Sequence, residues 1–249
     1  MNALILAAGL GTRLRPLTDN MPKALVKVAG RTLLETQITK LRAAGATEIV
    51  VNVHHLGRQI IDYVAARDWG VPVSISDERD SLLDTGGGLR KAWPLFHDAA
   101  APVLVHNVDI LGNAKLSTLY AGMETEHRCA ARLLVSQRET TRYLLFDDAM
   151  QLVGWTNTQT GEVRSPVEGL RPESCRRYAF SGIHVVGPLL RPRLDAGPEK
   201  FSIIDFYLSV CRDYCISGFV QDDLHLLDVG KTTALAEAAQ FIEPETAPI

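Results

Sequence analysis

The 249-residue sequence lacks both a long apolar run and a strong excess of either charge. No apolar stretch reaches the roughly 18–20 residues that a membrane-spanning helix needs, so we expect no insertion into a bilayer. The N-terminal residues lack the charged region and the extended apolar core of a signal peptide. A formal net charge of −3 gives no reason to expect a nucleic acid as partner. Any binding of phosphate must therefore depend on a few focused groups.

Cysteine is also scarce, and the four thiols do not have the spacing of zinc ligands. Cys129, Cys175, Cys211 and Cys215 are scattered, and only the last two lie one helical turn apart. Small buried or half-buried thiols are the simplest interpretation of such a set. Because reduced thiols are typical of the cytoplasm, we expect a cytoplasmic protein.

Strand and helix patterns alternate through the first half of the chain. Short apolar or β-branched runs predict strands at 3–8, 48–53, 71–76 and 102–107. Apolar residues at helical spacing predict helices at 32–44, 56–68 and 84–96. Because parallel strands are joined by right-handed helical crossovers, this rhythm predicts an α/β fold with a doubly wound, mostly parallel sheet.

The second half has a different pattern, in which antiparallel insertions are expected. Strands are predicted at 130–135, 216–220 and 224–227, a hairpin at 143–155, and a strand pair or bent strand at 178–186. Helices are predicted at 201–213 and 232–241, the last packing through Leu235, Ala238 and Ile242. The polar stretch 161–174 is expected to be mobile, and the tail from Glu243 to be frayed. No linker or repeat is visible, which favours a single domain over 1–249.

A glycine loop follows the first predicted strand and is the strongest local signal. Backbone N–H groups at Gly9 and Gly11 can point at an anion, and Arg13 and Lys23 can add two cations. The third glycine of a dinucleotide fingerprint is replaced by Leu14, and a Walker-type Gly-Lys-Ser/Thr ending is absent. A plain tight turn remains the alternative, but it does not explain the two cations. The loop therefore predicts a site for a nucleoside triphosphate.

Two aspartates each end an apolar run where the carboxyl edge of the sheet is expected. Asp109 follows the strand at 102–107, and Asp228 follows the strand at 224–227. Two carboxylates with few other protein ligands suit Mg²⁺, which keeps waters and takes further oxygens from phosphates. Helix-capping or turn aspartates are the alternative for each residue alone.

The segment 84–88, Asp-Thr-Gly-Gly-Gly, opens a predicted helix at the same sheet edge. Its backbone groups could approach a base or a ribose, and a flexible turn is the alternative. Five histidines stand within or beside predicted elements, and none has metal-ligand spacing: His54, His55, His106, His184 and His225. They are interpreted as structural.

Together these motifs resemble a known family. The pattern from Leu6 to Lys23, LAAGLGTRLRPLTDNMPK, resembles the signature of sugar-1-phosphate nucleotidyltransferases, or nucleoside-diphosphate-sugar pyrophosphorylases. The resemblance continues at 22–30, 84–88, 107–109, 180–183 and 228–230. The Thr-Gly-Gly-Gly run and the compact length are most similar to N-acetylmuramate 1-phosphate uridylyltransferases. We expect no β-helical acetyltransferase extension.

The resemblance implies a Rossmann-like nucleotidyltransferase fold whose 1–128 half binds mainly nucleotide and whose 129–242 half binds mainly sugar. It implies Mg²⁺-assisted attack of a sugar 1-phosphate on the α-phosphorus of a nucleoside triphosphate, with UTP as the expected donor. The implied roles are catalysis for Arg13 and Lys23, metal binding for Asp109 and Asp228, nucleotide binding for Ala8, Gly9, Gly11, Thr12, Thr85 and Gly86, and sugar binding for Asn107, Glu168 and Gly182. The oligomeric state is left open.

Two positions depart from the family pattern. Val108 stands where relatives have glycine before the metal aspartate, and Gly169 follows Glu168 where many have lysine. The second change removes a cation near the sugar phosphate and leaves the acceptor open. Guanylyl, thymidylyl or cytidylyl transfer, the last also to phosphocholine, are alternatives. A non-catalytic nucleotide-sugar sensor is the alternative of another class, and only Val108 favours it.

Overall fold

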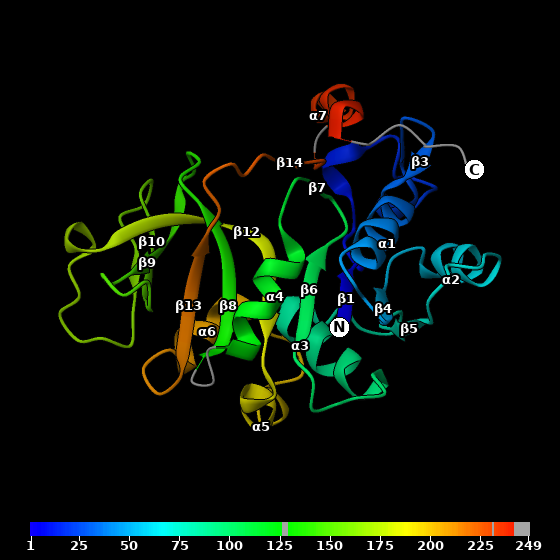
Figure 1. The fold of residues 1–249 in the computed structure, drawn as a ribbon. Coiled ribbons are helices and arrows are strands. Elements are labelled where there is room, and N and C mark those ends of the chain that lie inside the picture. Colours follow the sequence, from blue (N-terminus) through cyan, green and yellow to red (C-terminus); the bar gives the residue numbers. More distant parts are fainter. Residues whose placement is uncertain (126–128, 231, 242–249) are drawn as a thin grey trace.

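The computed structural model describes residues 1–125, 129–230 and 232–241, and Figure 1 shows a broad twisted sheet with helices against it. Ten strands form this sheet: β1 (Asn2–Leu6), β4 (Glu48–Val53), β5 (Val73–Asp77), β6 (Val103–Asn107), β8 (Cys129–Ser136), β9 (Arg142–Phe146), β10 (Leu152–Asn157), β11 (Val163–Arg164), β12 (Arg176–Val186) and β13 (Cys215–Val220). Two small pairs accompany it: β2 (Lys27–Val28) with β3 (Arg31–Thr32), and β7 (Ile110–Gly112) with β14 (Leu226–Asp228).

The helices are α1 (Leu33–Ala43), α2 (Gly57–Ala65), α3 (Asp84–Ala92), α4 (Leu116–Thr125), α5 (Arg191–Asp195), α6 (Ile203–Val210) and α7 (Thr232–Ala238). The first of them shows how the local sequence sets its bounds. Thr32 caps α1 by accepting a hydrogen bond of 3.0 Å from the Glu35 N–H, and Gly45 follows its end with φ +98°. The predicted helix at 32–44 is confirmed to within a residue at each end. None of the helices that the structure describes is long and apolar enough to cross a membrane.

The strand order is β11-β10-β9-β12-β6-β1-β4-β5, with β8 beside β12 and β13 beside β8. Pairing is parallel through β6, β1, β4 and β5, and the apolar runs of β6, β1 and β4 are buried on both faces. The antiparallel part begins where β12 joins β6. The predicted doubly wound, mixed sheet is therefore confirmed, and the parallel half brings the carboxyl ends of β1, β4 and β6 to one edge.

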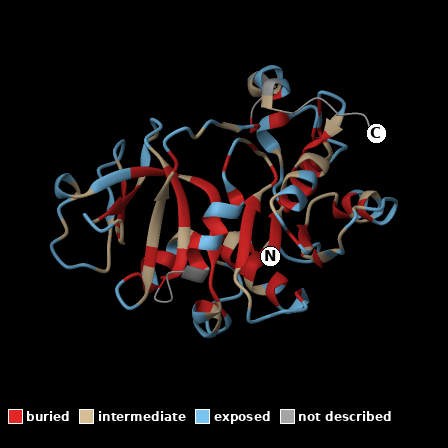
Figure 2. Cartoon of the chain, viewed as in Figure 1, coloured by how far each residue is buried: buried red, intermediate tan, exposed pale blue. Residues whose placement is uncertain are grey.

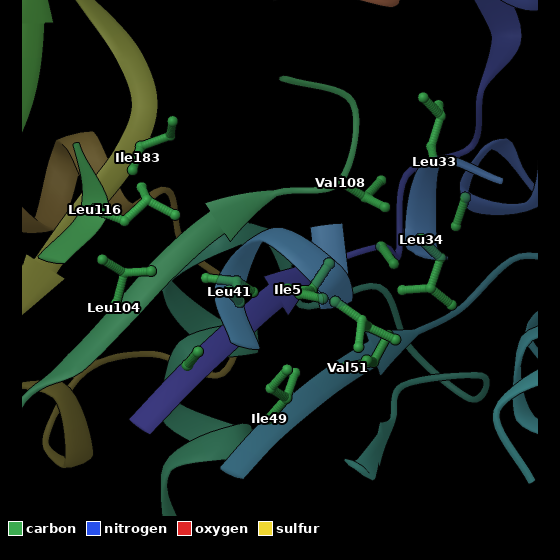
Figure 3. Close-up of a cluster of buried hydrophobic side chains, with 14 of the residues drawn as sticks. Ile5, Leu33, Leu34, Leu41, Ile49, Val51, Leu104, Val108, Leu116 and Ile183 are labelled. Atoms are coloured by element: carbon green, nitrogen blue, oxygen red, sulfur yellow. The ribbon is translucent and has the colours of Figure 1, made fainter. Parts of the chain in front are cut away.

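Alternate residues of the central strands point to two separate apolar cores. Ile5 packs with α1, α2 and α4 on one face, as the close-up in Figure 3 shows for Leu34 and Leu41 of α1. Its neighbour Leu4 packs with α3, α5 and α6 on the other face. Buried strands and exposed outer helix surfaces are visible in Figure 2. Each fully buried aliphatic side chain contributes about 1.5–3 kcal/mol, so these two cores hold the site edge in place.

Some elements differ from the sequence-based expectation. The segment 178–186 is one bent strand, β12, whose register shifts between Phe180 and His184 while Gly182 takes φ +75°. The stretch 161–174 contains the short strand β11, paired with β10. Helix α4 was not predicted, since serine, threonine and glycine interrupt its apolar period.

The C-terminal helix agrees with the expectation where it is described. Leu235 and Ala238 pack against the core that contains Ile5, whereas Ile242 and the tail from Glu243 lie outside the described residues. The halves 1–128 and 129–242 stay a prediction.

Candidate active site

A cleft of about 530 Å³ lies at the carboxyl ends of β1, β4 and β6. It brings together nine of the residues singled out from the sequence, namely Ala8, Gly9, Gly11, Thr12, Arg13, Lys23, Thr85, Asn107 and Asp109. This is where a doubly wound sheet binds its ligands, because the loops that follow its strands converge there.

The glycine loop forms one wall of the cleft and is held in a fixed shape. Gly11 takes φ +65°, and its carbonyl accepts hydrogen bonds from the Leu14 N–H at 2.9 Å and the Thr18 hydroxyl at 2.8 Å. A Cβ at Gly11 would lie 3.1 Å from the Thr18 methyl group, so glycine fits the position on both counts. Apart from its two chain neighbours, no group of the described residues lies within 4 Å of the place where a Cβ on Gly9 would stand. The loop is therefore rigid at Gly11 and open at Gly9.

Lys23 and Asp109 form an ion pair within the cleft. Lys23 begins a 3₁₀ turn over Lys23–Leu25, directly after the extended Pro22. Its ammonium donates a hydrogen bond to Asp109 Oδ2, and the two side chains are only 10% and 19% exposed. A charge pair so shielded from water interacts more strongly than a surface pair. The cation and the carboxylate predicted for the reacting centre thus lie in direct contact.

Arg13 and Asp228 form a second, more exposed pair. Arg13 Nη2 lies 3.8 Å from Asp228 Oδ2, and both side chains are more than half exposed. Gly230 allows this approach, because a Cβ there would lie 2.6 Å from Arg13 Nη2. The pair adds little to stability, but it places the guanidinium at the rim of the cleft.

Backbone pairing brings the two aspartates together across more than a hundred residues. Asp228 pairs with Ile110 in the β14–β7 ladder, and the Val229 N–H donates to the Asp109 carbonyl at 2.9 Å. Among the described residues, no group of three or more His, Cys, Asp or Glu could hold a metal ion. A cation bound here would therefore rest on two carboxylates and take its other ligands from water and phosphate, which fits the preference of Mg²⁺.

The segment 84–88 is helical from its start and does not form a loop. Thr85 lines the cleft, and its hydroxyl accepts a hydrogen bond of 2.9 Å from the Ile203 N–H. Gly86 is buried behind it and does not line the cleft. Its N–H donates to the Phe201 carbonyl at 2.9 Å, and a Cβ would lie 2.3 Å from the Phe201 ring. Close packing against Phe201 thus explains why glycine stands at position 86, while contact of Gly86 with the nucleotide stays a prediction.

A second cavity of about 430 Å³ continues from the cleft and shares Leu6, Asp84, Thr85 and Asn107 with it. Gly182 and Asp228 line this cavity too. A Cβ on Gly182 would lie 2.4 Å from Asn107 Nδ2, so only glycine lets β12 pass so close to that amide. We call this space the acceptor cavity. Glu168 is exposed in the connection between β11 and β12 and lines neither space, so its sugar contact stays a prediction.

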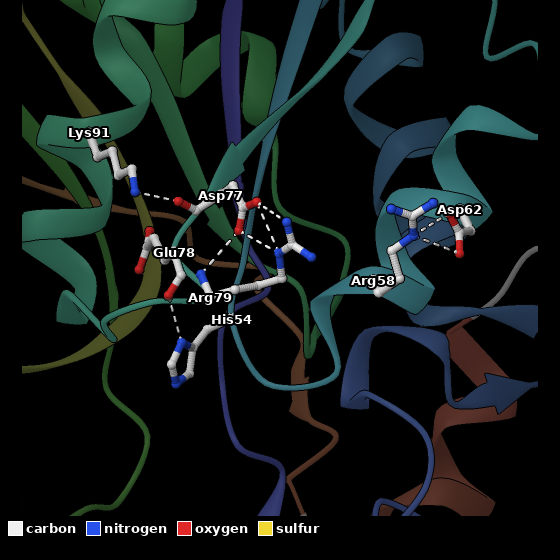
Figure 4. A network of polar contacts seen from close by, with 7 residues as sticks. All are labelled: His54, Arg58, Asp62, Asp77, Glu78, Arg79 and Lys91. Carbon is white, nitrogen blue, oxygen red and sulfur yellow. Dashed lines mark hydrogen bonds and ion pairs between the residues drawn. The ribbon is translucent and has the colours of Figure 1, made fainter.

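Sequence reasoning missed Asn52, which supports the glycine loop from β4. Asn52 Oδ1 accepts a hydrogen bond of 2.6 Å from the Ala7 N–H, and its Nδ2 donates to Glu78 Oε1 at 2.8 Å. Glu78 Oε2 accepts from the Leu83 N–H at 3.3 Å, and burial raises the pKa of Glu78. Figure 4 shows Glu78 beside His54, Asp77 and Lys91. A single asparagine within the apolar run Glu48–Val53 was the available signal.

Three other residues line the cleft or the acceptor cavity without having been predicted as site residues. Lys200 lines the cleft from the loop before α6, and nothing in the surrounding sequence pointed to it. Arg138 lines the acceptor cavity just after β8. Val108, where the family pattern predicts glycine, is 4% exposed and packs in the apolar core of Figure 3. Although Val108 also lines the cleft, this burial puts most of its side chain below the cleft floor.

Comparison with known proteins agrees with this geometry. Residues 2–164 match the family model for nucleotidyl transferases. The chain is 42% identical over 243 residues to an N-acetylmuramate alpha-1-phosphate uridylyltransferase of Neisseria meningitidis, covering 96% of each. It is 32% identical over 252 residues to the enzyme of the same name from Caulobacter vibrioides, covering 97% of each.

A solved structure shares the fold at low sequence identity. The inositol-1-phosphate CTP transferase from T. maritima superposes with a TM-score of 0.75 at 15% identity, covering 97% of this chain and 94% of that one. The expected nucleotidyltransferase fold is confirmed. The family match and the near full-length relatives also confirm the family and the activity class expected from the Leu6–Lys23 pattern. The chain therefore belongs to the nucleotidyl transferase family and is a nucleotidyltransferase.

Proposed function

We propose that the enzyme transfers the uridylyl group of UTP to N-acetylmuramate 1-phosphate, giving a nucleotide sugar and pyrophosphate. The largely shielded Lys23–Asp109 pair in the cleft carries the proposal, because it puts a cation and a carboxylate suited to a metal ion at one point. The names of the two near full-length relatives support the choice of nucleotide and acceptor.

In this proposal the glycine loop holds the nucleotide. Backbone groups at Ala8, Gly9, Gly11 and Thr12 meet the ribose and phosphates, and Thr85 and Gly86 lie toward the base. The open space above Gly9 and the support of the Ala7 N–H by Asn52 favour this role. A loop already fixed in shape loses little conformational entropy when it binds its ligand.

The acceptor phosphate oxygen attacks the α-phosphorus in line, and pyrophosphate leaves from the opposite side. Lys23 donates hydrogen bonds to oxygens at the reacting phosphorus, where negative charge must be held. Arg13 grips the β and γ end with its planar guanidinium and steadies the departing pyrophosphate. Positioning and charge neutralisation supply the rate enhancement in such transfers, so no covalent enzyme intermediate is required.

Asp109 and Asp228 would hold one Mg²⁺ ion, in keeping with the backbone pairing that brings these two aspartates together. The ion supplies positive charge to the phosphate oxygens. Lys23 and Arg13 each exchange a carboxylate partner for a phosphate when the substrates arrive, so the site changes partners without leaving a charge unpaired.

The acceptor sugar lies in the acceptor cavity, against Asn107 and Gly182. A contact with Glu168, which lines neither space here, requires the loop before β12 to move toward the cavity. Free cysteines throughout the described residues favour a reducing compartment, and we place the enzyme in the cytoplasm. Its product would serve synthesis of the cell envelope. Neither a nucleic acid nor a membrane is required as partner.

Release of pyrophosphate tests the proposal. The enzyme with Mg²⁺ is given UTP, dTTP, GTP or CTP together with each of several sugar 1-phosphates and phosphocholine. UTP with N-acetylmuramate 1-phosphate is expected to give the highest kcat/KM. A higher value for another pair would replace the proposed substrates. Tight nucleotide binding without turnover of any pair would favour the nucleotide-sugar sensor.

A further inference from the structure

We infer that Arg138 is a specificity-determining residue that binds a second anionic group, a carboxylate, on the acceptor sugar. The inference rests on the proposed function. It adds the chemical group on the acceptor sugar that the acceptor cavity recognises. It concerns the side of that cavity away from Lys23: of the two spaces, Lys23 lines only the cleft and Arg138 only the acceptor cavity, while Arg138 also borders two neighbouring grooves.

Backbone geometry fixes Arg138 beside the predicted sugar residues. The residue follows β8, and its Nη2 donates to the Phe180 carbonyl on β12 at 3.3 Å. Phe180 stands two residues before Gly182, where β12 bends against Asn107. The guanidinium is thereby held at the wall of the acceptor cavity by the same strand that forms the sugar side.

Arg138 is also available to a ligand anion. It is the only Lys or Arg among the described residues that line the acceptor cavity. No ion pair found among the described residues involves Arg138. The neighbouring Arg164 differs, because it pairs with Asp205 at 2.5 Å and lies over the Trp155 ring at 4.0 Å. Arg164 is thus neutralised by a carboxylate of the protein, whereas Arg138 forms no such ion pair among the described residues.

The rest of the cavity wall, as far as the structure describes it, supplies no other cation. His184 lines it from β12 and contacts the rings of Phe180 and Tyr207 at centroid distances of 5.5 and 5.7 Å. Burial lowers the pKa of His184 to about 3, so its ring is neutral at pH 7. Ile203 and Ile204 add apolar wall. A carboxylate bound at this end would therefore have Arg138 as its partner.

The chemistry of the acceptor supplies such a group. N-acetylmuramate 1-phosphate carries a lactyl carboxylate on the sugar, in addition to the phosphate that reacts. N-acetylglucosamine 1-phosphate has the same sugar and phosphate but lacks the lactyl group. A planar guanidinium matches a carboxylate with two parallel hydrogen bonds, so it can distinguish these acceptors.

The test compares kcat/KM for the two acceptors with UTP and Mg²⁺. The wild-type enzyme should prefer N-acetylmuramate 1-phosphate, and its lactyl methyl ester should behave like the neutral sugar. Arg138→Gln should lower the ratio of the two kcat/KM values by about tenfold, the scale of one lost charge-assisted contact. The loss should be in KM, because the carboxylate is remote from the reacting phosphorus. Arg138→Lys should restore part of the ratio.

Arg142→Gln is the matched control, since Arg142 is an exposed arginine of the adjoining groove but does not line the acceptor cavity. It should leave the ratio unchanged. An equal loss in both variants, or an unchanged ratio in Arg138→Gln, would overturn the inference while leaving the proposed function intact. Absence of turnover with either acceptor would instead overturn the proposed function. In that case calorimetric binding of the two sugar 1-phosphates to wild type and Arg138→Gln decides the role of Arg138.

Discussion

Lys23 donates to Asp109 across 86 residues of sequence, and both side chains are largely shielded from water. The pair connects the glycine loop, which follows β1, to the end of β6. Its members are the cation proposed for the reacting phosphate and one carboxylate proposed for the metal. Removing either partner leaves an uncompensated charge at the centre of the cleft.

Lys23→Ala should lower kcat by roughly 10²–10³-fold, the scale for losing one preorganised charge contact in a transition state. Pyrophosphate release under saturating UTP and acceptor measures it. Lys27→Ala provides the control, because Lys27 is an exposed lysine on β2 nearby. If Lys23→Ala keeps near-normal turnover while it remains folded by circular dichroism, Lys23 does not act at the reacting centre.

Asp109→Asn and Asp228→Asn should each abolish the activation of turnover by Mg²⁺. Each substitution keeps the side-chain shape but removes a negative charge that a hard cation requires. Mg²⁺ titrations of activity, and of UTP binding by calorimetry, provide the measurement. Asp223→Asn, which changes a surface carboxylate paired with Lys115, should titrate like wild type. An undiminished Mg²⁺ response in either cleft variant would remove that aspartate from the metal site.

Asn52→Ala should destabilise the fold by about 3 kcal/mol and raise the KM for UTP, because it strands two buried groups. The Ala7 N–H loses its acceptor, and Glu78 Oε1 loses the donor that Asn52 supplies. Urea denaturation and steady-state kinetics measure the two effects.

Ser76→Ala is the matched control for Asn52→Ala. Ser76 faces Asn52 in the β4–β5 register and is 1% exposed, yet its hydroxyl has no hydrogen-bond partner among the described residues. This substitution should cost little stability and leave KM unchanged. Similar effects from both variants would show that Asn52 acts only as a buried polar residue.

The parallel half of the sheet could be predicted because its signals are local. Glu48–Val53 is rich in β-branched apolar residues, and it forms β4 with the same bounds. The glycine loop and Asp109 follow strands directly, so the sheet edge on which they meet was predictable too. In such a fold, the position of a residue after its strand is enough to place it near the ligand.

Long-range packing decided what could not be predicted. The hydrogen bonds of Asn52 join β4 to the loop after β1 and to Glu78, none of which is local in sequence. Arg138 reaches the acceptor cavity only because β12 bends at Gly182 and leaves Phe180 beside it. The burial of Gly86 against Phe201 could not be predicted either, because it depends on where α6 packs.

Two buried histidines should make stability depend on pH. Burial lowers the pKa values of His106 and His184 to about 3, from an ordinary value of 6.5. The unfolded chain therefore binds two more protons than the folded chain between these pH values. The stabilisation is complete above pH 6.5 and is lost as the pH falls from 6.5 toward 3, at about 1.4 kcal/mol per pH unit for each histidine.

His184→Phe should remove one of the two protons that the chain takes up on unfolding below pH 6.5. Both ring nitrogens of His184 lack partners among the described residues, so an apolar ring should replace it without stranding another group. Urea denaturation between pH 4.5 and 5.5, where the unfolded histidine is almost fully protonated and the folded one is not, should show the slope of unfolding free energy against pH reduced by about 1.4 kcal/mol per unit. The exposed His97, changed to Gln, should leave the slope as in wild type. An unaltered slope in His184→Phe would mean that this histidine takes up its proton without unfolding the protein.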